Sequence, residues 1–311
     1  MPLEPAQEQA LEELNERLKV VRDRVRGVAW GHHNGFYLYG RPGTSKTYTV
    51  IKTLKELDVP HYHQVGHITP MGLFDLLGEQ HDRVIVLDDV SEIFKQPKAL
   101  QILLAALGDQ PDNEKVRLVR YRRQGVIVDV RFTGGIICLS NLELSATPLL
   151  MALKSRVHYL KYDPSDEQIR ALMYLVASTG WPEELPKVAP EDCKEVTDYL
   201  IAESARLAVR LDMRLLVDKA LPDFLQWRLG QTEAHWRDLV TATLEEQLVQ
   251  LKHTPANRLS RQEQKDTEKA LARRIFSQHP TREARVAAWE AHAGKSERAF
   301  YRRLAEIGLT D

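Results

Sequence analysis

The sequence has few cysteines and no long apolar run. Only Cys138 and Cys193 occur among its 311 residues, and no stretch of 18 consecutive apolar residues is present. Two cysteines cannot build a disulfide framework, and they suit a reducing compartment. A membrane helix needs about 20 apolar residues, and the charged N-terminus does not resemble a signal peptide. We therefore expect a cytoplasmic protein that makes no membrane contact.

Neither sign of charge dominates the chain as a whole. The net charge is -1, and charged residues make up 28% of the sequence against 43% hydrophobic ones. This balance allows a sizeable core in two or three modules. Residues 253–311 nevertheless carry twelve Lys and Arg against eight Asp and Glu. Contact with nucleic acid is therefore expected to be local.

Apolar runs and helical patterns alternate through the first half of the chain. Residues 1–30 have apolar side chains at helical spacing, which predicts an N-terminal amphipathic helix. Strands separated by helices are typical of a mostly parallel sheet covered on both faces. The sequence therefore predicts an α/β domain over residues 31–163. The expected strands are 35–40, 61–65, 83–89, 135–141 and 157–162.

Later segments depart from this alternation. Residues 116–132 have the pattern of two strands around a turn at 123–125, which predicts a β-hairpin inserted into the α/β core. Helical periodicity over residues 164–252 predicts a helical module, and the polar stretch 253–266 predicts a linker. Residues 267–311 contain three short helical patterns, so we expect a small all-α C-terminal domain.

The stretch GRPGTSKT differs by one residue from the phosphate-loop pattern Gly-x-x-x-x-Gly-Lys-[Ser/Thr], because Ser45 stands where glycine is usual. It follows an apolar strand and precedes a helical run, as such a loop must. We expect the loop amides and Lys46 to hold the phosphates of ATP, and the Thr47 hydroxyl to ligate Mg²⁺. Ser45 adds about 1 to 2 kcal/mol of strain if its backbone is left-handed. The expected nucleotide contacts in the loop are Gly40, Gly43, Thr44, Ser45, Lys46 and Thr47.

Two carboxylates follow the apolar run VIVL. A carboxylate at the tip of a buried strand beside a phosphate loop holds the magnesium shell, and the next one can polarise the attacking water. We therefore expect Asp88 to act at the metal and Asp89 to act as the catalytic base. Acidic residues after a strand are common by themselves, so this prediction depends on the neighbouring loop.

The order GRPGTSKT, VIVLDD, IICLSN and LKSR resembles the AAA+ family of ring-forming ATPases over roughly residues 31–221. The resemblance implies a P-loop NTPase core with a helical lid, ATP hydrolysis with Mg²⁺, and assembly into a homo-oligomeric ring or helical filament. It also implies that Asn141 positions the attacking water, that Arg156 reaches the γ-phosphate of a neighbouring subunit, and that Arg214 is the sensor of the lid. Arg210 lies close enough in the sequence to compete for that last role.

Two positions depart from the pattern of this family. Ser45 is the first, and Asp89 is the second, because most AAA+ ATPases have glutamate as the catalytic base. Aspartate is shorter by one C–C bond, roughly 1.5 Å, so its carboxylate has to be brought closer to the attacking water. Asp-Asp pairs occur in superfamily 3 helicases, whose sensor resembles the LSN of this chain.

The hairpin expected at 116–132 resembles an insertion with which AAA+ machines handle nucleic acid. It contains Arg117, Arg120, Arg122, Arg123 and Arg131. Arginines suit a phosphate backbone, and we expect Arg122 and Arg123 to contact DNA. Arginines on a solvated hairpin also serve solubility, and this alternative stays open.

Residues 281–309 resemble a helix-turn-helix unit. Ala293 and Gly294 predict a tight turn, and Ser296 can cap the helix that follows. The expected core residues are Val286, Trp289, Phe300, Leu304 and Ile307. Cations lie along or beside one face of the last helix, as a major-groove reader needs. The expected DNA contacts are Lys295, Arg298, Arg302 and Arg303, and a basic helical hairpin for protein docking is the alternative.

Two other groups of residues favour structural interpretations. His61, His63 and His67 alternate along an expected strand, but no Cys or carboxylate pattern typical of a zinc site accompanies them. Trp227 and Trp236 fall among apolar residues at helical spacing, which indicates core packing rather than base stacking.

Three functions remain open. The first is a DNA-acting AAA+ ATPase of the replication initiator, helicase loader or transposition type, in a mobile element or phage, associated with the nucleoid when DNA is bound. The second is a ring-translocating helicase that resembles superfamily 3. The third is a protein-remodelling ATPase that does not act on DNA.

Overall fold

The computed structural model describes residues 5–108, 115–123, 126–182, 187–253, 268–269, 271–272, 275–276, 279, 281–293, 296–307 and 309. The chain divides into two compact units, Met1–Glu246 and Gln247–Asp311. The expected N-terminal helix and residues 164–246 of the expected helical module belong to the first unit together with the sheet. Of the linker expected at 253–266, His253 is the last residue of a helix, and residues 254–266 lie outside the described residues.

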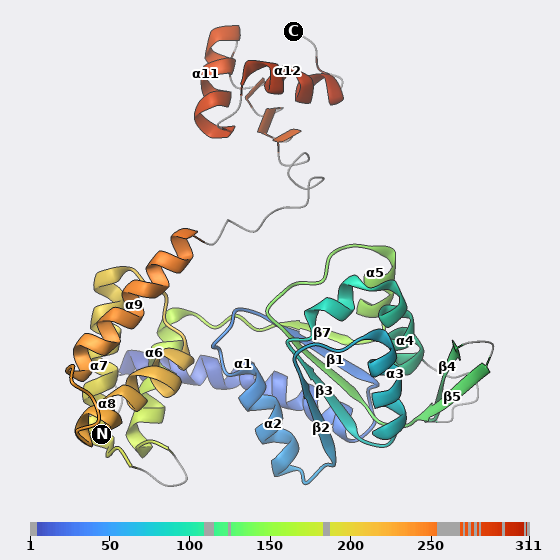
Figure 1. Ribbon diagram of the computed structural model, residues 1–311, viewed down its shortest axis with the longest axis horizontal. Coiled ribbons are helices and arrows are strands. Elements are labelled where there is room, and N and C mark those ends of the chain that lie inside the picture. Colours follow the sequence, from blue (N-terminus) through green and yellow to red (C-terminus); the bar gives the residue numbers. More distant parts are fainter. Residues whose placement is uncertain are drawn as a thin grey trace. The chain divides into compact units, whose positions relative to one another are not determined.

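The first unit contains a five-stranded parallel sheet with helices on both faces (Figure 1). Its strands are β1 (Gly35–Tyr39), β2 (His61–Val65), β3 (Val84–Asp88), β6 (Ile136–Ser140) and β7 (His158–Lys161), in the order β2-β3-β6-β1-β7. All neighbouring pairs are parallel. The predicted parallel α/β sheet is therefore confirmed, and each strand lies within one or two residues of its expected bounds.

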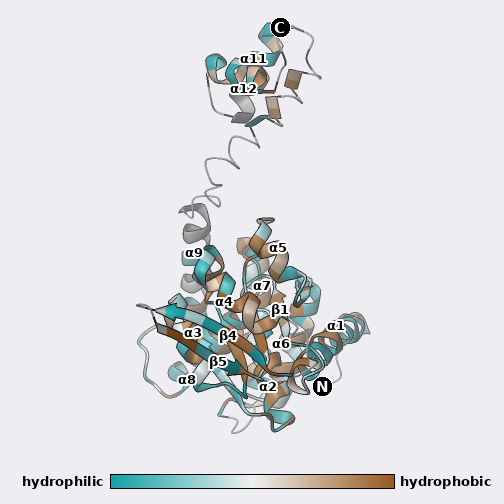
Figure 2. Ribbon diagram, turned by 90° about the vertical axis from the view of Figure 1, so that its right-hand side faces the viewer, coloured by the Kyte–Doolittle hydropathy of each residue, from teal (hydrophilic) through white to brown (hydrophobic). Residues whose placement is uncertain are grey.

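Alternate residues of the central strands enter two separate cores. Phe36 and Leu38 pack beneath α1 (Pro5–Ala29) and α2 (Lys46–Glu56) on one face. Tyr37 and Tyr39 pack on the other face. The helices of that face are α3 (Pro70–Glu79), α4 (Pro97–Leu107) and α5 (Pro148–Lys154), with a 3₁₀ turn, η1 (Ser91–Lys95). Figure 2 shows hydrophobic colour along the central strands, as burial on both faces requires.

The predicted hairpin consists of β4 (Arg117–Arg123) and β5 (Val126–Phe132), which form a separate antiparallel two-stranded sheet. Its base belongs to the core, because Val119 and Phe132 are buried there and the Tyr121 ring lies 5.3 Å from that of Phe74. The turn residues 124–125 lie outside the described residues.

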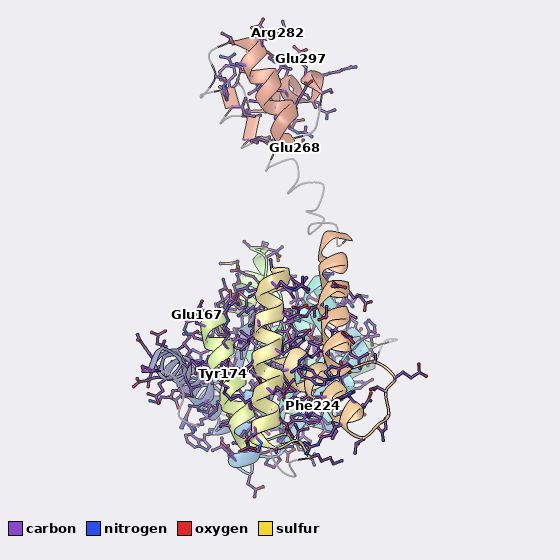
Figure 3. All side chains as sticks on the ribbon, turned by 90° about the vertical axis from the view of Figure 1, so that its left-hand side faces the viewer. Glu167, Tyr174, Phe224, Glu268, Arg282 and Glu297 are labelled. Carbon is purple, nitrogen blue, oxygen red and sulfur yellow. The ribbon has the colours of Figure 1, made fainter. Side chains whose placement is uncertain are left out.

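Helices follow the sheet in the first unit. They are α6 (Asp166–Thr179), α7 (Pro190–Leu207), a π-helical segment η2 (Leu215–Ala220), α8 (Leu221–Arg228) and α9 (Trp236–His253), whose last residues belong to the second unit. A capping box between Ser165 and Gln168 starts α6. The Tyr174 hydroxyl on α6 donates to Asp198 on α7 at 2.7 Å (Figure 3).

The two tryptophans of this region differ in exposure. Trp236 is 1% exposed and packs against Phe224, which confirms a core role. Trp227 is 37% exposed and only partly fits that interpretation. No helix among the described residues has the length and apolarity to cross a bilayer.

The described part of the second unit contains α11 (Arg282–Ala293) and α12 (Glu297–Glu306). The predicted core residues Trp289, Phe300 and Leu304 are buried, with Ile307 packed against them. Arg282 of α11 and Glu297 of α12 form an ion pair at 2.7 Å (Figure 3). Ser296 is the N-cap residue of α12, as expected, but its hydroxyl makes no capping bond to the described residues.

Candidate nucleotide-binding site

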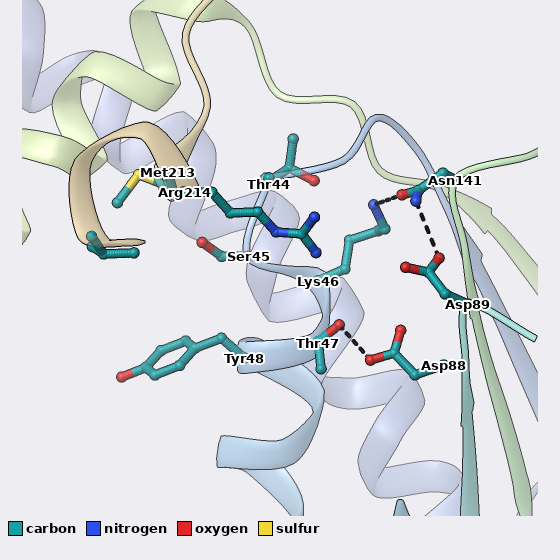
Figure 4. A pocket seen from close by; sticks show the side chains of 12 residues that line it. Thr44, Ser45, Lys46, Thr47, Tyr48, Asp88, Asp89, Asn141, Met213 and Arg214 are labelled. Carbon is teal, nitrogen blue, oxygen red and sulfur yellow. Dashed lines mark hydrogen bonds between the residues drawn. The ribbon is translucent and has the colours of Figure 1, made fainter. Parts of the chain in front are cut away.

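The strand order brings the sequence-predicted residues to one edge of the sheet. Because β6 lies between β1 and β3, the loop after β1, the acids at the end of β3 and Asn141 after β6 meet at the carboxyl ends of neighbouring strands. Ligands of open α/β sheets bind at that edge. These residues line one cleft of about 190 Å³ that is open to solvent (Figure 4).

Close approaches in the phosphate loop account for its glycines. A Cβ on Gly40 would lie 1.8 Å from the carbonyl oxygen of Tyr162, so no side chain fits there. Gly43 has a φ of 68°, and a Cβ would lie 2.5 Å from Cβ of Asp212. Ser45 has a φ of 64° and a ψ of 21°, so the residue that replaces glycine is held in the left-handed region. The strain that the sequence predicted for this backbone is therefore present.

Lys46 is the buried cation of the site, with 7% exposure. Its ammonium group donates to the carbonyl oxygens of Gly40 at 2.9 Å and Arg41 at 2.7 Å, and to Oδ1 of Asn141 at 3.0 Å. Burial lowers the pKa of Lys46 from 10.5 to about 8, and nearby Asp89 partly opposes this shift. Phosphate oxygens would supply negative charge that raises this pKa again.

The two carboxylates make different contacts. The Thr47 hydroxyl donates to Oδ2 of Asp88 at 3.0 Å. Asp89 follows β3 in a left-handed conformation with a φ of 53°, and its Oδ1 accepts from the Asn141 amide at 3.1 Å. Asn141 thus connects the ammonium of Lys46 to the carboxylate of Asp89. Strained non-glycine backbone is concentrated at functional sites, and here Ser45 and Asp89 both show it.

Thr47 and Asp88 fit magnesium by their chemistry. Mg²⁺ prefers oxygen ligands and usually takes one or two carboxylates, with water and substrate phosphates completing its shell. The hydroxyl and the carboxylate lie together at the start of α2, and the Asp88 side chain is 13% exposed. In the part of the chain that the structure describes, no group of three or more His, Cys, Asp or Glu is arranged to hold a metal. Thr47 and Asp88 offer two oxygen ligands, so water and phosphate oxygens would have to complete the shell of such an ion.

The helical module contributes Arg214 to the cleft, together with Met213 and Val217. The Met213 amide donates to the carbonyl oxygen of Gly43 at 2.8 Å, which fixes this segment against the phosphate loop. Oδ1 of Asp212 accepts from the Leu215 amide at 3.0 Å. The π-helical segment η2 begins at Leu215, and such segments are frequent at functional sites.

Arg210, the competitor of Arg214 in the sequence, lies elsewhere. Its Nε donates to Asp166 at 3.3 Å, and Arg41 of the phosphate loop binds the same carboxylate oxygen at 2.7 Å. The guanidinium of Arg41 also donates to the carbonyl oxygen of Pro164 at 2.7 Å. Arg41 and Asp166 therefore tie the loop to the helical module, a contact that the sequence analysis missed because it joins residues 125 positions apart.

Arg156 is not part of this cleft. It precedes β7, so it lies at the amino-terminal edge of the parallel sheet, opposite the edge that carries the phosphate loop. Its guanidinium donates to the carbonyl oxygen of Ala152 at 2.9 Å, and it lines a separate cavity with His33 and His158. Arg156 therefore cannot act on the cleft of its own chain, and its action on a neighbouring copy stays a prediction.

The structure corrects part of the expected DNA surface. Arg303 is not an exposed cation, because its side chain is 6% exposed and pairs with Glu268 and Glu306 at 2.7 Å each. Arg298 and Arg302 are exposed on α12. Lys295 lies outside the described residues.

The hairpin arginines are also placed differently from one another. Arg122 is exposed on β4, whereas the Arg123 side chain lies outside the described part. Arg117 is buried against Phe132 and donates to Asn34, so it belongs to the core rather than to a DNA surface. Arg120 pairs with Asp129 at 2.8 Å.

One further contact of the site was missed from the sequence. Nε2 of His63, on β2, lies 3.0 Å from Oδ2 of Asp88. The pattern HYHQV did show imidazoles alternating along the strand, but only the pairing of β2 beside β3 shows which residue they meet.

Neither a scan against protein-family models nor a search of curated proteins finds a match to this chain. Function is therefore inferred from the residues of the cleft and from the exposed cations.

Proposed function

We propose that the chain is an AAA+-type ATPase that binds and hydrolyses ATP with Mg²⁺. The observation that carries this proposal is the hydrogen-bonded series Lys46, Asn141 and Asp89 beside the pair Thr47 and Asp88, all in one cleft at the start of α2. A cation, a polar amide and two carboxylates around a phosphate loop are the groups that phosphoryl transfer requires.

Each residue of the cleft has a role in this proposal. The loop amides and Lys46 bind the β- and γ-phosphates. Thr47 and Asp88 hold the cation, which when bound neutralises charge that develops on the phosphate oxygens. Asp89 accepts the proton of the attacking water, and Asn141, fixed by its bonds on both sides, orients that water. Arg214 contributes positive charge from the helical module.

The position of Arg156 supports a proposal of assembly. A guanidinium at the opposite edge of the sheet can complete an active site only in another copy. We therefore propose a homo-oligomer, as a ring or a helical filament, in which Arg156 reaches the γ-phosphate held by a neighbour. Arginine fingers supplied in this way typically contribute 10³ to 10⁵ in rate.

DNA is the proposed partner. Exposed Arg298 and Arg302 lie one turn apart on α12, and exposed Arg122 lies on the inserted hairpin. Such cations suit phosphate contacts. The proposal places the chain with replication initiators, helicase loaders or transposition ATPases of mobile elements or phages. The exposed arginine on the hairpin keeps a translocating helicase as the second candidate.

ATP hydrolysis with and without duplex and single-stranded DNA tests this proposal. The chain truncated after His253 keeps every residue of the cleft, so it should keep basal hydrolysis while losing stimulation by duplex DNA. Loss of Arg298 and Arg302 should lower the slope of log affinity against log salt by about two, at roughly 0.9 per phosphate contact. Duplex unwinding would favour the helicase, and hydrolysis that ignores both kinds of DNA would favour a protein-remodelling ATPase.

A further inference from the structure

His63 makes a contact at the metal-binding end of the cleft that the proposed mechanism leaves unused. Its Nε2 lies 3.0 Å from Oδ2 of Asp88, and the same oxygen accepts the Thr47 hydroxyl at 3.0 Å. The His63 side chain is 33% exposed and that of Asp88 is 13% exposed. One carboxylate oxygen therefore receives two donors from two different elements, β2 and α2.

The pairing of the strands brings the imidazole to this position. β2 lies beside β3 in parallel register, with His63 opposite Val86 and Val65 opposite Asp88. Residues two apart on a strand share a face of the sheet. His63 therefore reaches diagonally along this face to the last residue of β3.

The geometry defines the role of the imidazole as a donor. An ionised carboxylate only accepts hydrogen bonds, so Nε2 of His63 carries the proton that points to Asp88. A direct bond from Nε2 to a cation would need that nitrogen without its proton. With Thr47 and His63 both on Oδ2, Oδ1 of Asp88 is the oxygen available to the shell of a cation.

We propose that His63 is a positioning residue that orients the Asp88 carboxylate for the divalent cation of the nucleotide site. This inference rests on the proposed nucleotide function. Groups that hydrogen-bond a ligating carboxylate typically contribute 10- to 100-fold to metal affinity. Removal of the donor should therefore weaken Mg²⁺ binding by about tenfold or more, without a comparable change in the affinity for metal-free nucleotide.

Three variants distinguish a hydrogen-bonding role of His63 from a packing role. His63→Phe keeps a ring of similar size but cannot donate, whereas His63→Gln keeps an N–H at a similar reach. His61→Phe is the matched control, because His61 lies on the same face of the same strand. The hydrogen bond that the structure describes for the His61 ring joins its Nδ1 to the nearby backbone oxygen of Val59. Thermal unfolding of each full-length variant checks that it folds.

The experiment measures binding of a fluorescent, non-hydrolysable ATP analogue as Mg²⁺ is titrated, and again with a chelator present. We expect His63→Phe to raise the half-saturating Mg²⁺ concentration about tenfold, and His63→Gln and His61→Phe to stay within about twofold of wild type. The inference would be overturned if His63→Phe and wild type had the same half-saturating Mg²⁺ concentration. It would also be overturned if His63→Gln and His63→Phe raised this concentration equally. Equal loss of metal-free binding would show a structural role instead, and would also overturn it.

Asp88→Asn provides the reference that separates this inference from the proposed function. If Asp88→Asn weakens Mg²⁺ dependence and His63→Phe does not, only the role of His63 is wrong. If neither substitution changes it, the assignment of the metal to Asp88 is wrong as well.

Discussion

The ammonium of Lys46 donates a hydrogen bond to the side-chain oxygen of Asn141 at 3.0 Å. The lysine comes from the start of α2 and the asparagine follows β6, so the bond joins the phosphate loop to the strand beside it. Through its amide, Asn141 also binds Asp89. A phosphate that attracts Lys46 would therefore also act on the group that holds the proposed base.

The lowered pKa of Lys46 predicts a pH dependence of nucleotide binding. Burial lowers this pKa to about 8, and phosphate charge should raise it again. Between pH 8 and pH 10, binding should therefore take up a proton, and affinity should fall as pH rises. Calorimetry at pH 8.5 in two buffers of different ionisation enthalpy measures this uptake. Binding with no proton uptake at this pH would contradict the prediction.

The lowered pKa of Lys46 also makes the stability of the nucleotide-free protein depend on pH. Between about pH 8 and 10.5 the unfolded chain holds a proton at Lys46 that the folded chain has lost, so the free energy of unfolding rises with pH in that window. Below pH 8 the folded protein carries the full cost of a buried ammonium group. Lys46→Met removes the titrating group, and its stability should lack this rise.

Ser45→Gly should stabilise the protein. Glycine relieves about 1 to 2 kcal/mol of left-handed strain, and the greater freedom of the unfolded chain takes back about 0.4 to 1 kcal/mol. A net gain of about 0.5 to 1 kcal/mol should raise the melting temperature by a few degrees, with ATP affinity equal or higher. Ser45→Ala keeps the Cβ and should show no gain. A Ser45→Gly protein that loses nucleotide would mean that the hydroxyl, and not the backbone, is needed at this position.

Features that depend on the local sequence pattern were predictable, whereas contacts between residues far apart in the chain were not. The strands were predictable because buried parallel strands are short apolar runs between helices. The contact of Arg41 with Asp166 was not predictable, because it depends on how the helical module folds back onto the loop. Arg303 was misplaced for a similar reason. Helical periodicity places Arg302 and Arg303 near the same face, and only Glu268, 35 residues away, shows which of them enters the core.

Arg156 and Asp89 should complement each other in mixed assemblies. Arg156→Ala should lower hydrolysis by about 10³ to 10⁵, and Asp89→Asn should be similarly inactive, while both retain nucleotide binding. Because the two groups of one chain lie at opposite edges of the sheet, mixing the variants creates some interfaces with both groups intact. Partial recovery of hydrolysis on mixing is expected. Full activity of Arg156→Ala alone, or of strictly monomeric wild-type protein, would contradict it.

Alanine substitutions at the adjacent residues Arg302 and Arg303 should have different effects on stability and on DNA binding. Arg303→Ala removes a 6% exposed guanidinium that pairs with Glu268, while Glu306 keeps its ion pair with Lys269 at 3.6 Å. The loss of this buried pairing should destabilise the second unit by about 1 to 3 kcal/mol. Arg302→Ala changes an exposed side chain, so stability should move by about 0.5 kcal/mol or less, while the salt slope of DNA binding falls by roughly 0.9. Hydrogen exchange in the full-length chain and salt titrations of DNA affinity measure the two effects. An unchanged second unit in Arg303→Ala would contradict the burial of this residue.

The proposal that this cleft binds ATP is tested by equilibrium binding of ATP, in the presence of Mg²⁺, to wild-type protein and to Lys46→Ala. Lys46 is the buried cation of the cleft and bonds to the loop and to Asn141, so its removal should abolish tight binding while the fold is kept. We expect saturable binding by wild type and no tight binding by Lys46→Ala over the same range of ATP concentrations. Absence of binding to folded wild-type protein, or equal affinity in the two proteins, would contradict it.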